Sequence, residues 1–123
     1  MPKATKATTP ITMDFPVAED RACDLEDITV NFVTIREAHD LAPMLAKLPT
    51  GRCECPHWGV VSAGRMTATY ADGTTESFGP GDAFYMTPGH TAAAEAGTEL
   101  VQFSPKDLLA ETEAAMAAAM SGG

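Results

Sequence analysis

A short segment, Cys53-Glu-Cys-Pro-His57, brings together residue types that bind transition metals. On a β-strand, side chains two residues apart point to the same side, so Cys53, Cys55 and His57 would face one way. Two thiols and an imidazole in such a row are typical ligands of zinc or copper rather than of magnesium or calcium. The segment therefore predicts a divalent metal site, and zinc is the metal that we expect.

A metal is not the only interpretation of these cysteines. Buried cysteines often act as small hydrophobic residues, and Pro56 could interrupt the strand and turn His57 out of phase. A disulfide between Cys53 and Cys55 would be strained. The chain has three cysteines, an odd number, and its first ten residues lack the apolar core of a secretory signal. Both features predict a cytoplasmic protein with reduced thiols.

The composition is that of a globular protein and disfavours several partners. Of the 123 residues, 45% are hydrophobic and 20% are charged, which is normal for a folded domain. The formal net charge is −9, so we expect neither nucleic acid nor an anionic membrane surface as a partner. No apolar run approaches the ~20 residues that a membrane-spanning helix needs.

The N-terminal third of the chain is polar and acidic. Residues 1–13 predict a flexible tail, and residues 14–123 predict a single domain. The stretch 14–40 holds eight acidic residues, which we interpret as a solvated face. Within it, residues 28–32 alternate between apolar and polar side chains, a pattern that predicts a half-buried strand.

From residue 53 to residue 103 the pattern is β throughout. Short apolar runs are separated by turn signals every ~8–12 residues. Three of these signals are Asp72-Gly73, Gly79-Pro-Gly81 and Pro88-Gly89. Such spacing predicts an antiparallel sandwich or small barrel with a core over about residues 28–104.

One helix is predicted on each side of this β-rich region. Asp40 is placed to cap a short helix with Pro43 in its first turn. The apolar residues of this helix would be Leu41, Met44, Leu45 and Leu48. Ser104 is placed to cap a C-terminal helix over about residues 105–120. The buried stripe of that helix would comprise Leu108, Leu109, Met116 and Met120.

Three segments of the chain resemble those of small single-domain bacterial cupins: Gly51–Gly64, Tyr70–Gly73 and Gly79–His90. The first contains CxCPHWG, as do similar cupin-domain proteins of largely unassigned function. The resemblance extends over about residues 28–105. It implies an all-β cupin fold, that is, a double-stranded β-helix or jelly-roll barrel. It also implies a homodimer in which sheets of two copies pair.

The first cupin motif does not map onto this chain without changes. Gly64 matches the glycine that closes the motif, and His57 then falls at the glutamate ligand. Cys53 falls at the second histidine ligand when the spacer has three residues. Alternatively, Cys53 and Cys55 together replace the histidine pair.

The second cupin motif places its histidine ligand at Ala92, where this chain has no side chain that binds metal. His90 shares the strand phase of Ala92 and could supply the missing nitrogen, or it is simply a turn residue. The ligand set that we expect is Cys53, Cys55, His57 and His90. Four ligands would make a closed structural site, and three would leave a position open for chemistry.

Aromatic and small residues complete the expected site. Tyr70 or Tyr85 could transfer a proton. The expected pocket consists of Tyr70, Phe84, Met86 and Ala92. Trp58, the single tryptophan, is expected in the core or at a dimer contact.

Together these features favour a metal-binding cupin that binds or acts on a small organic molecule in its barrel, with the metal as a Lewis acid. The alternatives are a non-catalytic module, which binds a ligand or dimerises around a structural metal, and a cupin without metal.

Overall fold

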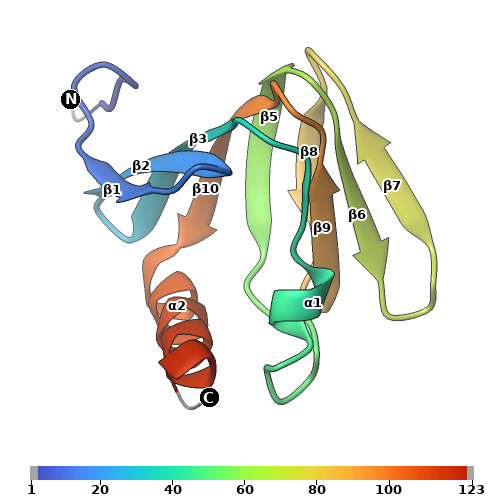
Figure 1. Ribbon diagram of the computed structural model, residues 1–123. Coiled ribbons are helices and arrows are strands. Elements are labelled where there is room, and N and C mark those ends of the chain that lie inside the picture. The colour runs from blue at the N-terminus through green and yellow to red at the C-terminus, as the bar shows by residue number, and fades with distance from the viewer. Residues whose placement is uncertain (1–2, 122–123) are drawn as a thin grey trace.

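The computed structural model describes residues 3–121 as two antiparallel sheets and two helices (Figure 1). The larger sheet has the order β1-β2-β3-β10-β5-β8. Its strands are β1 Ile11–Asp14, β2 Ala18–Leu25, β3 Ile28–Ile35, β10 Glu99–Pro105, β5 His57–Ala63 and β8 Ala83–Met86. The smaller sheet has the order β4-β9-β6-β7. Its strands are β4 His39–Asp40, β9 His90–Ala94, β6 Met66–Tyr70 and β7 Thr75–Phe78. The helices are α1 Ala42–Leu45 and α2 Lys106–Ser121.

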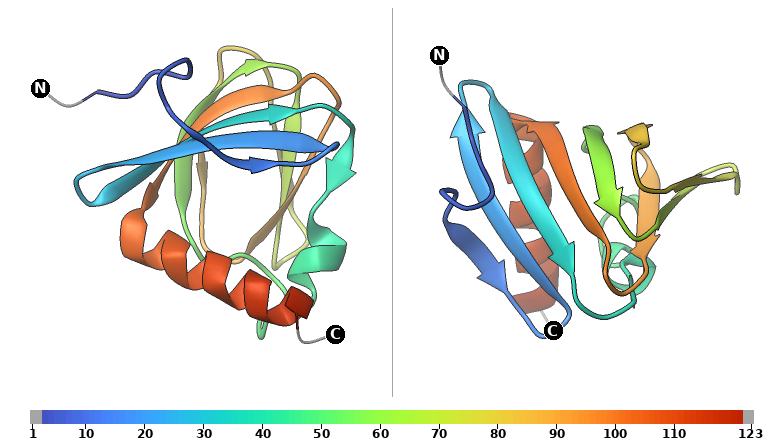
Figure 2. Two further views of the ribbon diagram at one scale, coloured as in Figure 1. Left: turned by 60° about the vertical axis from the view of Figure 1, so that its left-hand side comes forward. Right: turned by 90° about the horizontal axis from the view of Figure 1, so that it is seen from above.

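The two sheets face each other, and α2 runs across one end of the space between them (Figure 2, left). Along β5, buried and exposed side chains alternate, as expected for a strand with one face in the core. The core between the sheets is apolar and consists of Val61, Met66, Ala68, Phe78, Phe84, Met86 and Leu100. The prediction of an all-β body with two flanking helices is confirmed.

Gly59 allows the close packing on the inner face of β5. A Cβ atom at this position would overlap the carbonyl oxygen of Val101 and the ring of Phe84. Only glycine therefore lets the ring of Phe84 come this close to the strand two residues after His57.

The strand predicted at 28–32 extends to Ile35 as β3, and β3 pairs with β2 along its whole length. The acidic stretch is thus not only a solvated face, because Ala18–Leu25 forms a strand within it.

Residues 11–13, from the expected tail, lie in β1 and pair with β2. Thr9 is buried and donates a hydrogen bond to the carbonyl of Thr5 at 2.7 Å. Residues 1–2 lie outside the described part of the chain.

The short helix α1 lies at its predicted place, but its N-cap residue is Leu41 rather than Asp40, and the Leu41 side chain makes no capping hydrogen bond. The Ala42 N–H donates to the Asp40 carboxylate at 2.9 Å, and Leu45 is buried beneath the helix.

In α2, Leu109 is buried, but Leu108 is 43% exposed, which contradicts its place in the buried stripe. The helix presents one narrow face to β3 and β10, and Leu108 lies outside it. The side chain of Met120 lies outside the described part.

A second apolar cluster lies at the end of the molecule that α2 covers. It consists of Leu45, Leu48, Cys53, Cys55 and Leu109, with Leu41, Ala115 and Met116 packed against it. This cluster joins α1 and α2 to the segment that carries the candidate metal ligands.

Candidate metal centre

Three of the predicted ligands, Cys53, His57 and His90, converge in the structure. One ligand atom from each lies within 4.8 Å of the other two, and all three residues are buried. The backbone brings them together, because Cys53 forms a bridge with His90 at the start of β9. The Cys53 N–H donates to the His90 carbonyl at 2.8 Å, and the His90 N–H donates back to the Cys53 carbonyl at 3.2 Å.

Each imidazole is held through its Nδ1 atom. His90 Nδ1 donates to the carbonyl of Thr87 at 2.7 Å, which leaves the lone pair on His90 Nε2. His57 Nδ1 lies 2.7 Å from the hydroxyl of Ser104, and its Nε2 lies 3.5 Å from Cys53 Sγ. The Cys53 thiol donates to the carbonyl of Cys55 at 3.7 Å. In the tautomer of His57 that carries the proton on Nδ1, the ring donates to the Ser104 hydroxyl. Both rings then present the Nε2 lone pair, as metal-binding histidines do.

Burial keeps the ligand side chains neutral when no cation is present. It lowers the pKa of His57 to about 3, and the neighbouring His90 contributes in the same direction. Burial also lowers the pKa of His90, which the Thr87 carbonyl and the Glu54 carboxylate partly oppose. Burial raises the pKa of the Cys53 thiol. The imidazoles are therefore in the form that binds a metal at neutral pH, and only Cys53 has a proton to lose.

The fourth predicted ligand, Cys55, lies outside this group. The chain is not a regular strand between Cys53 and His57, since Pro56 interrupts it and β5 begins only at His57. Cys55 is 1% exposed within the second apolar cluster, to which Cys53 also belongs, and burial raises its pKa to about 12. The alternation that should have placed three side chains on one side breaks at Pro56.

Ser104 has a different role from the predicted helix cap. Its hydroxyl is fully buried and lies against His57 rather than at the first turn of α2. Strand register sets this contact, because Phe103 pairs with Trp58 and the next residues along the two strands are Ser104 and His57. Thr87, the partner of His90, precedes the Pro88-Gly89 turn, and no sequence pattern singles it out.

The three ligands line a cavity of about 310 Å³ between the sheets and α2. Met86 and Ala92 of the expected pocket also line it, whereas Tyr70 and Phe84 do not and instead pack in the core between the sheets. The Tyr70 hydroxyl donates to Glu76 at 3.3 Å. Tyr85 is 44% exposed on the outer face, stacked on Trp58 with ring centroids 4.7 Å apart. The structure thus brings neither tyrosine to the cavity.

The cavity has a polar part that the sequence did not reveal. Asp20 from β2, Asn31 from β3, Gln102 from β10 and Glu113 from α2 line it together with the metal ligands. Apart from its acidic charge, the sequence shows no motif in this set, because its members come from four separate elements.

No family model matches the chain. No curated protein matches it either. Solved structures do match. A protein of unknown function from Rhizobium leguminosarum is 23% identical, with a TM-score of 0.61 over 85% of this chain and 95% of the other. An RmlC-like cupin from Shewanella frigidimarina is 15% identical, with a TM-score of 0.56 over 83% and 88% of the two chains.

The chain has the cupin fold. The polyketide cyclase RemF from Streptomyces resistomycificus is also similar to this chain, at 16% identity and a TM-score of 0.58 over 86% of this chain and 80% of the other. The fold that the three cupin-like segments implied is confirmed. At these identities the likeness extends to the fold alone, so the chemistry of the site follows from its own geometry. Within residues 3–121, no helix combines the length and the apolar character needed to cross a membrane.

Proposed function

We propose that this cupin binds a divalent metal, zinc by its donor set, through Cys53, His57 and His90, and that a small organic molecule binds beside it in the cavity. The observation that carries the proposal is the convergence of one sulfur and two nitrogen ligands on a cavity of about 310 Å³. A soft thiolate with two imidazoles suits zinc and does not suit magnesium or calcium.

The protein residues prepare such a site in defined ways. Ser104 and Thr87 hold Nδ1 of the two rings and so aim the Nε2 atoms at one point. Cys53 would supply a single negative charge as a thiolate. A zinc ion bound there would act as a Lewis acid on a carbonyl or carboxyl oxygen of the ligand. The apolar lining from Met66, Met86 and Leu100 would exclude water around that oxygen.

The number of ligands favours an open site over a closed structural one. A structural zinc site has four protein ligands, and Cys55, the fourth candidate, is not among the residues whose ligand atoms converge. Three ligands beside a cavity leave one position for the bound molecule. The polyketide cyclase among the similar structures is an enzyme of this fold. This combination favours a metal-dependent enzyme, and the non-catalytic module remains the second candidate, in which the same site only binds its ligand.

Metal analysis of the protein purified without a histidine tag tests the proposal. We expect close to one zinc per chain, and a cobalt-substituted form that shows thiolate-to-cobalt charge transfer in the near ultraviolet. Cys53→Ser should abolish this band, and the matched variant Cys55→Ser should keep it. A band that disappears with Cys55→Ser and survives Cys53→Ser would contradict the proposed ligand set. Wild-type protein that takes up neither metal would contradict the site as a whole.

We also propose that two copies form a homodimer through the outer face of the larger sheet. The patch there consists of Trp58, Val60, Tyr85 and Phe103, which are exposed and adjacent in the register of β5, β8 and β10. Clustered exposed aromatic residues of this kind are typical of protein interfaces. Sedimentation should show a dimer for the wild type and a monomer for Trp58→Asp. A wild-type monomer at micromolar concentration would contradict the proposal.

A further inference from the structure

The polar part of the cavity is built around Asn31. Its Nδ2 donates to both carboxylate oxygens of Asp20, at 3.1 and 3.0 Å. The two residues lie on the neighbouring strands β2 and β3 and both line the cavity that holds the metal ligands. Glu113 reaches the same lining from α2.

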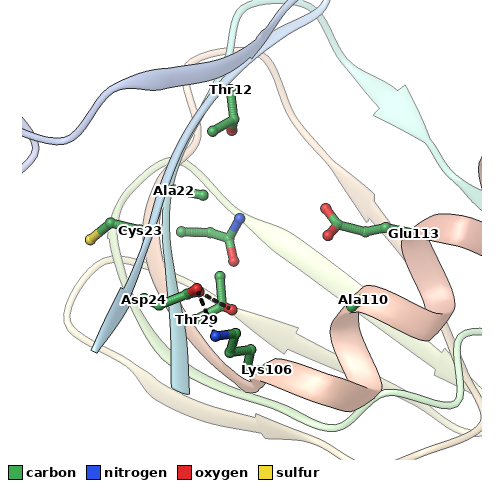
Figure 3. Close-up of a pocket in the computed structure, with 9 residues that line it drawn as sticks. Thr12, Ala22, Cys23, Asp24, Thr29, Lys106, Ala110 and Glu113 are labelled. Carbon is green, nitrogen blue, oxygen red and sulfur yellow. Dashed lines mark hydrogen bonds and ion pairs between the residues drawn. The ribbon is translucent and has the colours of Figure 1, made fainter. Parts of the chain in front are cut away.

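Asn31 has an unused hydrogen-bond acceptor. The residue is 3% exposed, and its Oδ1 atom has no hydrogen-bond partner. Asn31 and Glu113 also line a neighbouring cavity of about 360 Å³, so this amide lies where two cavities meet. Figure 3 shows Glu113 projecting from α2 across this second cavity toward β2. A buried amide oxygen without a donor is unfavourable unless a ligand supplies one.

Within residues 3–121, neither carboxylate forms an ion pair with a lysine or an arginine. None of the residues that line the cavity of the metal ligands is a lysine or an arginine. Lys106 lines the neighbouring cavity, but its ammonium lies 3.4 Å from the Asp24 carboxylate (Figure 3). Burial raises the pKa of Asp20, and burial together with the charge of Asp20 raises the pKa of Glu113. Negative charge at this place is therefore uncompensated.

We propose that this part of the cavity binds the cationic amine of a small molecule, with an ammonium or guanidinium group that donates to Asp20, Asn31 Oδ1 and Glu113. All three groups offer acceptors, so the complementary group is a donor with several N–H bonds. A positive charge would neutralise the two carboxylates, whereas an anionic group would be repelled. The inference rests on the proposed function in taking this cavity as the ligand chamber, but amine binding does not require the metal.

Binding of n-butylammonium, with n-butanol and butyrate as neutral and anionic analogues, tests this inference. Titrations followed by NMR should show saturable shifts of the Asn31 side-chain amide with n-butylammonium. The two analogues should bind at least tenfold more weakly at equal ionic strength, because they lack a charge-assisted donor. Equal binding of n-butanol would overturn the proposal, since burial of the alkyl chain alone would then explain it.

Two variants and one control locate the binding. Asp20→Asn should weaken n-butylammonium binding about tenfold, and Glu113→Gln at least threefold. Glu111→Gln is the matched control, because both glutamates are exposed on α2 but Glu111 lines neither cavity, and it should have no effect. Amine binding that is equal in Glu113→Gln and Glu111→Gln, together with unchanged binding in Asp20→Asn, would overturn the proposal.

A metal-site variant separates this inference from the proposed function. Cys53→Ser should leave n-butylammonium binding within twofold of the wild type even though it loses the metal. If the wild type binds the amine but takes up no metal, the proposed function fails and this inference stands. If it takes up metal and does not bind the amine, this inference fails and the metal site stands.

Discussion

The cavity of this protein has two chemically different parts. Around Cys53, His57 and His90 the side chains are neutral, and both Nδ1 atoms have hydrogen-bond partners. Around Asp20, Asn31 and Glu113 the side chains offer oxygen acceptors, and one of these acceptors has no partner. The first part is suited to a cation that binds nitrogen and sulfur, and the second to a donor group on the ligand itself. A molecule that uses both parts would therefore bind in one orientation only.

The largest expected effect concerns the metal part. Zinc at about 1,000 times its dissociation constant should raise the free energy of unfolding by about 4 kcal/mol, because it binds only the folded chain. The double variant Cys53→Ser, His57→Ala should gain nothing from zinc, whereas Asp20→Asn should gain as much as the wild type. Urea unfolding with and without zinc chloride measures all three. Equal stabilisation of the double variant would show that zinc binds elsewhere.

A smaller effect is expected from the residue that orients His57. Ser104→Ala removes the hydrogen-bond partner of Nδ1 and should weaken zinc binding about 10- to 100-fold. Competition with a chromophoric chelator measures this change. Ser62→Ala, on the same sheet and exposed, is the control and should leave the zinc affinity unchanged. An unaltered affinity in Ser104→Ala would mean that the apolar surroundings alone orient the ring.

The metal-free protein should lose stability in acid through His57. Its folded-state pKa lies near 3, below the ordinary value of 6.5, so the unfolded chain binds the proton first. The contribution of His57 is complete above pH 6.5 and declines as the pH falls toward 3. Between pH 6.5 and pH 5 the loss should reach at most about 2 kcal/mol, at about 1.4 kcal/mol for each unit.

Unfolding at several pH values tests this, with His57→Gln as the reference that lacks the titrating ring. The wild type should lose more stability than His57→Gln over this interval. Parallel pH profiles for the two proteins would show that His57 does not titrate as its burial requires.

The smallest expected effect concerns the acidic part of the cavity, where a substitution should raise the stability of the protein rather than lower it. Burial raises the pKa of Asp20 above 3.8, so its charge destabilises the folded state at neutral pH and less so as the pH falls through the folded-state pKa. Asp20→Asn should therefore be more stable than the wild type at pH 7, by about 1 kcal/mol or less. The difference should vanish near pH 3. A destabilised Asp20→Asn at pH 7 would show that the two bonds from Asn31 outweigh the cost of burying the charge.

Most of the β-rich body was predictable from the sequence, but its N-terminal strands were not. Turn signals such as Asp72-Gly73 are local, and they set the strands between residues 53 and 103. Strand β2 has no apolar alternation, because its cavity-facing positions carry Asp20 and Ala22 instead of large hydrophobic residues. A strand that faces a polar cavity lacks the pattern by which strands are recognised.

The candidate site was predictable to the extent that its residues are close in the sequence. Cys53 and His57 were found from their spacing, and His90 from its strand phase. The spacing did not show that Pro56 diverts Cys55, since this depends on where β5 begins. The contact between Ser104 and His57 depends on strand register, which a sequence pattern constrains only weakly.

The reciprocal backbone hydrogen bonds between Cys53 and His90 have a consequence for metal exchange. They hold two of the three candidate ligands side by side through backbone contacts, which do not involve the ligand atoms themselves. An incoming cation would find these two ligands already side by side, so the chain would lose little conformational entropy on binding it. One metal could then replace another while the chain stays folded, and the supply of ions around the protein would decide which of them it carries.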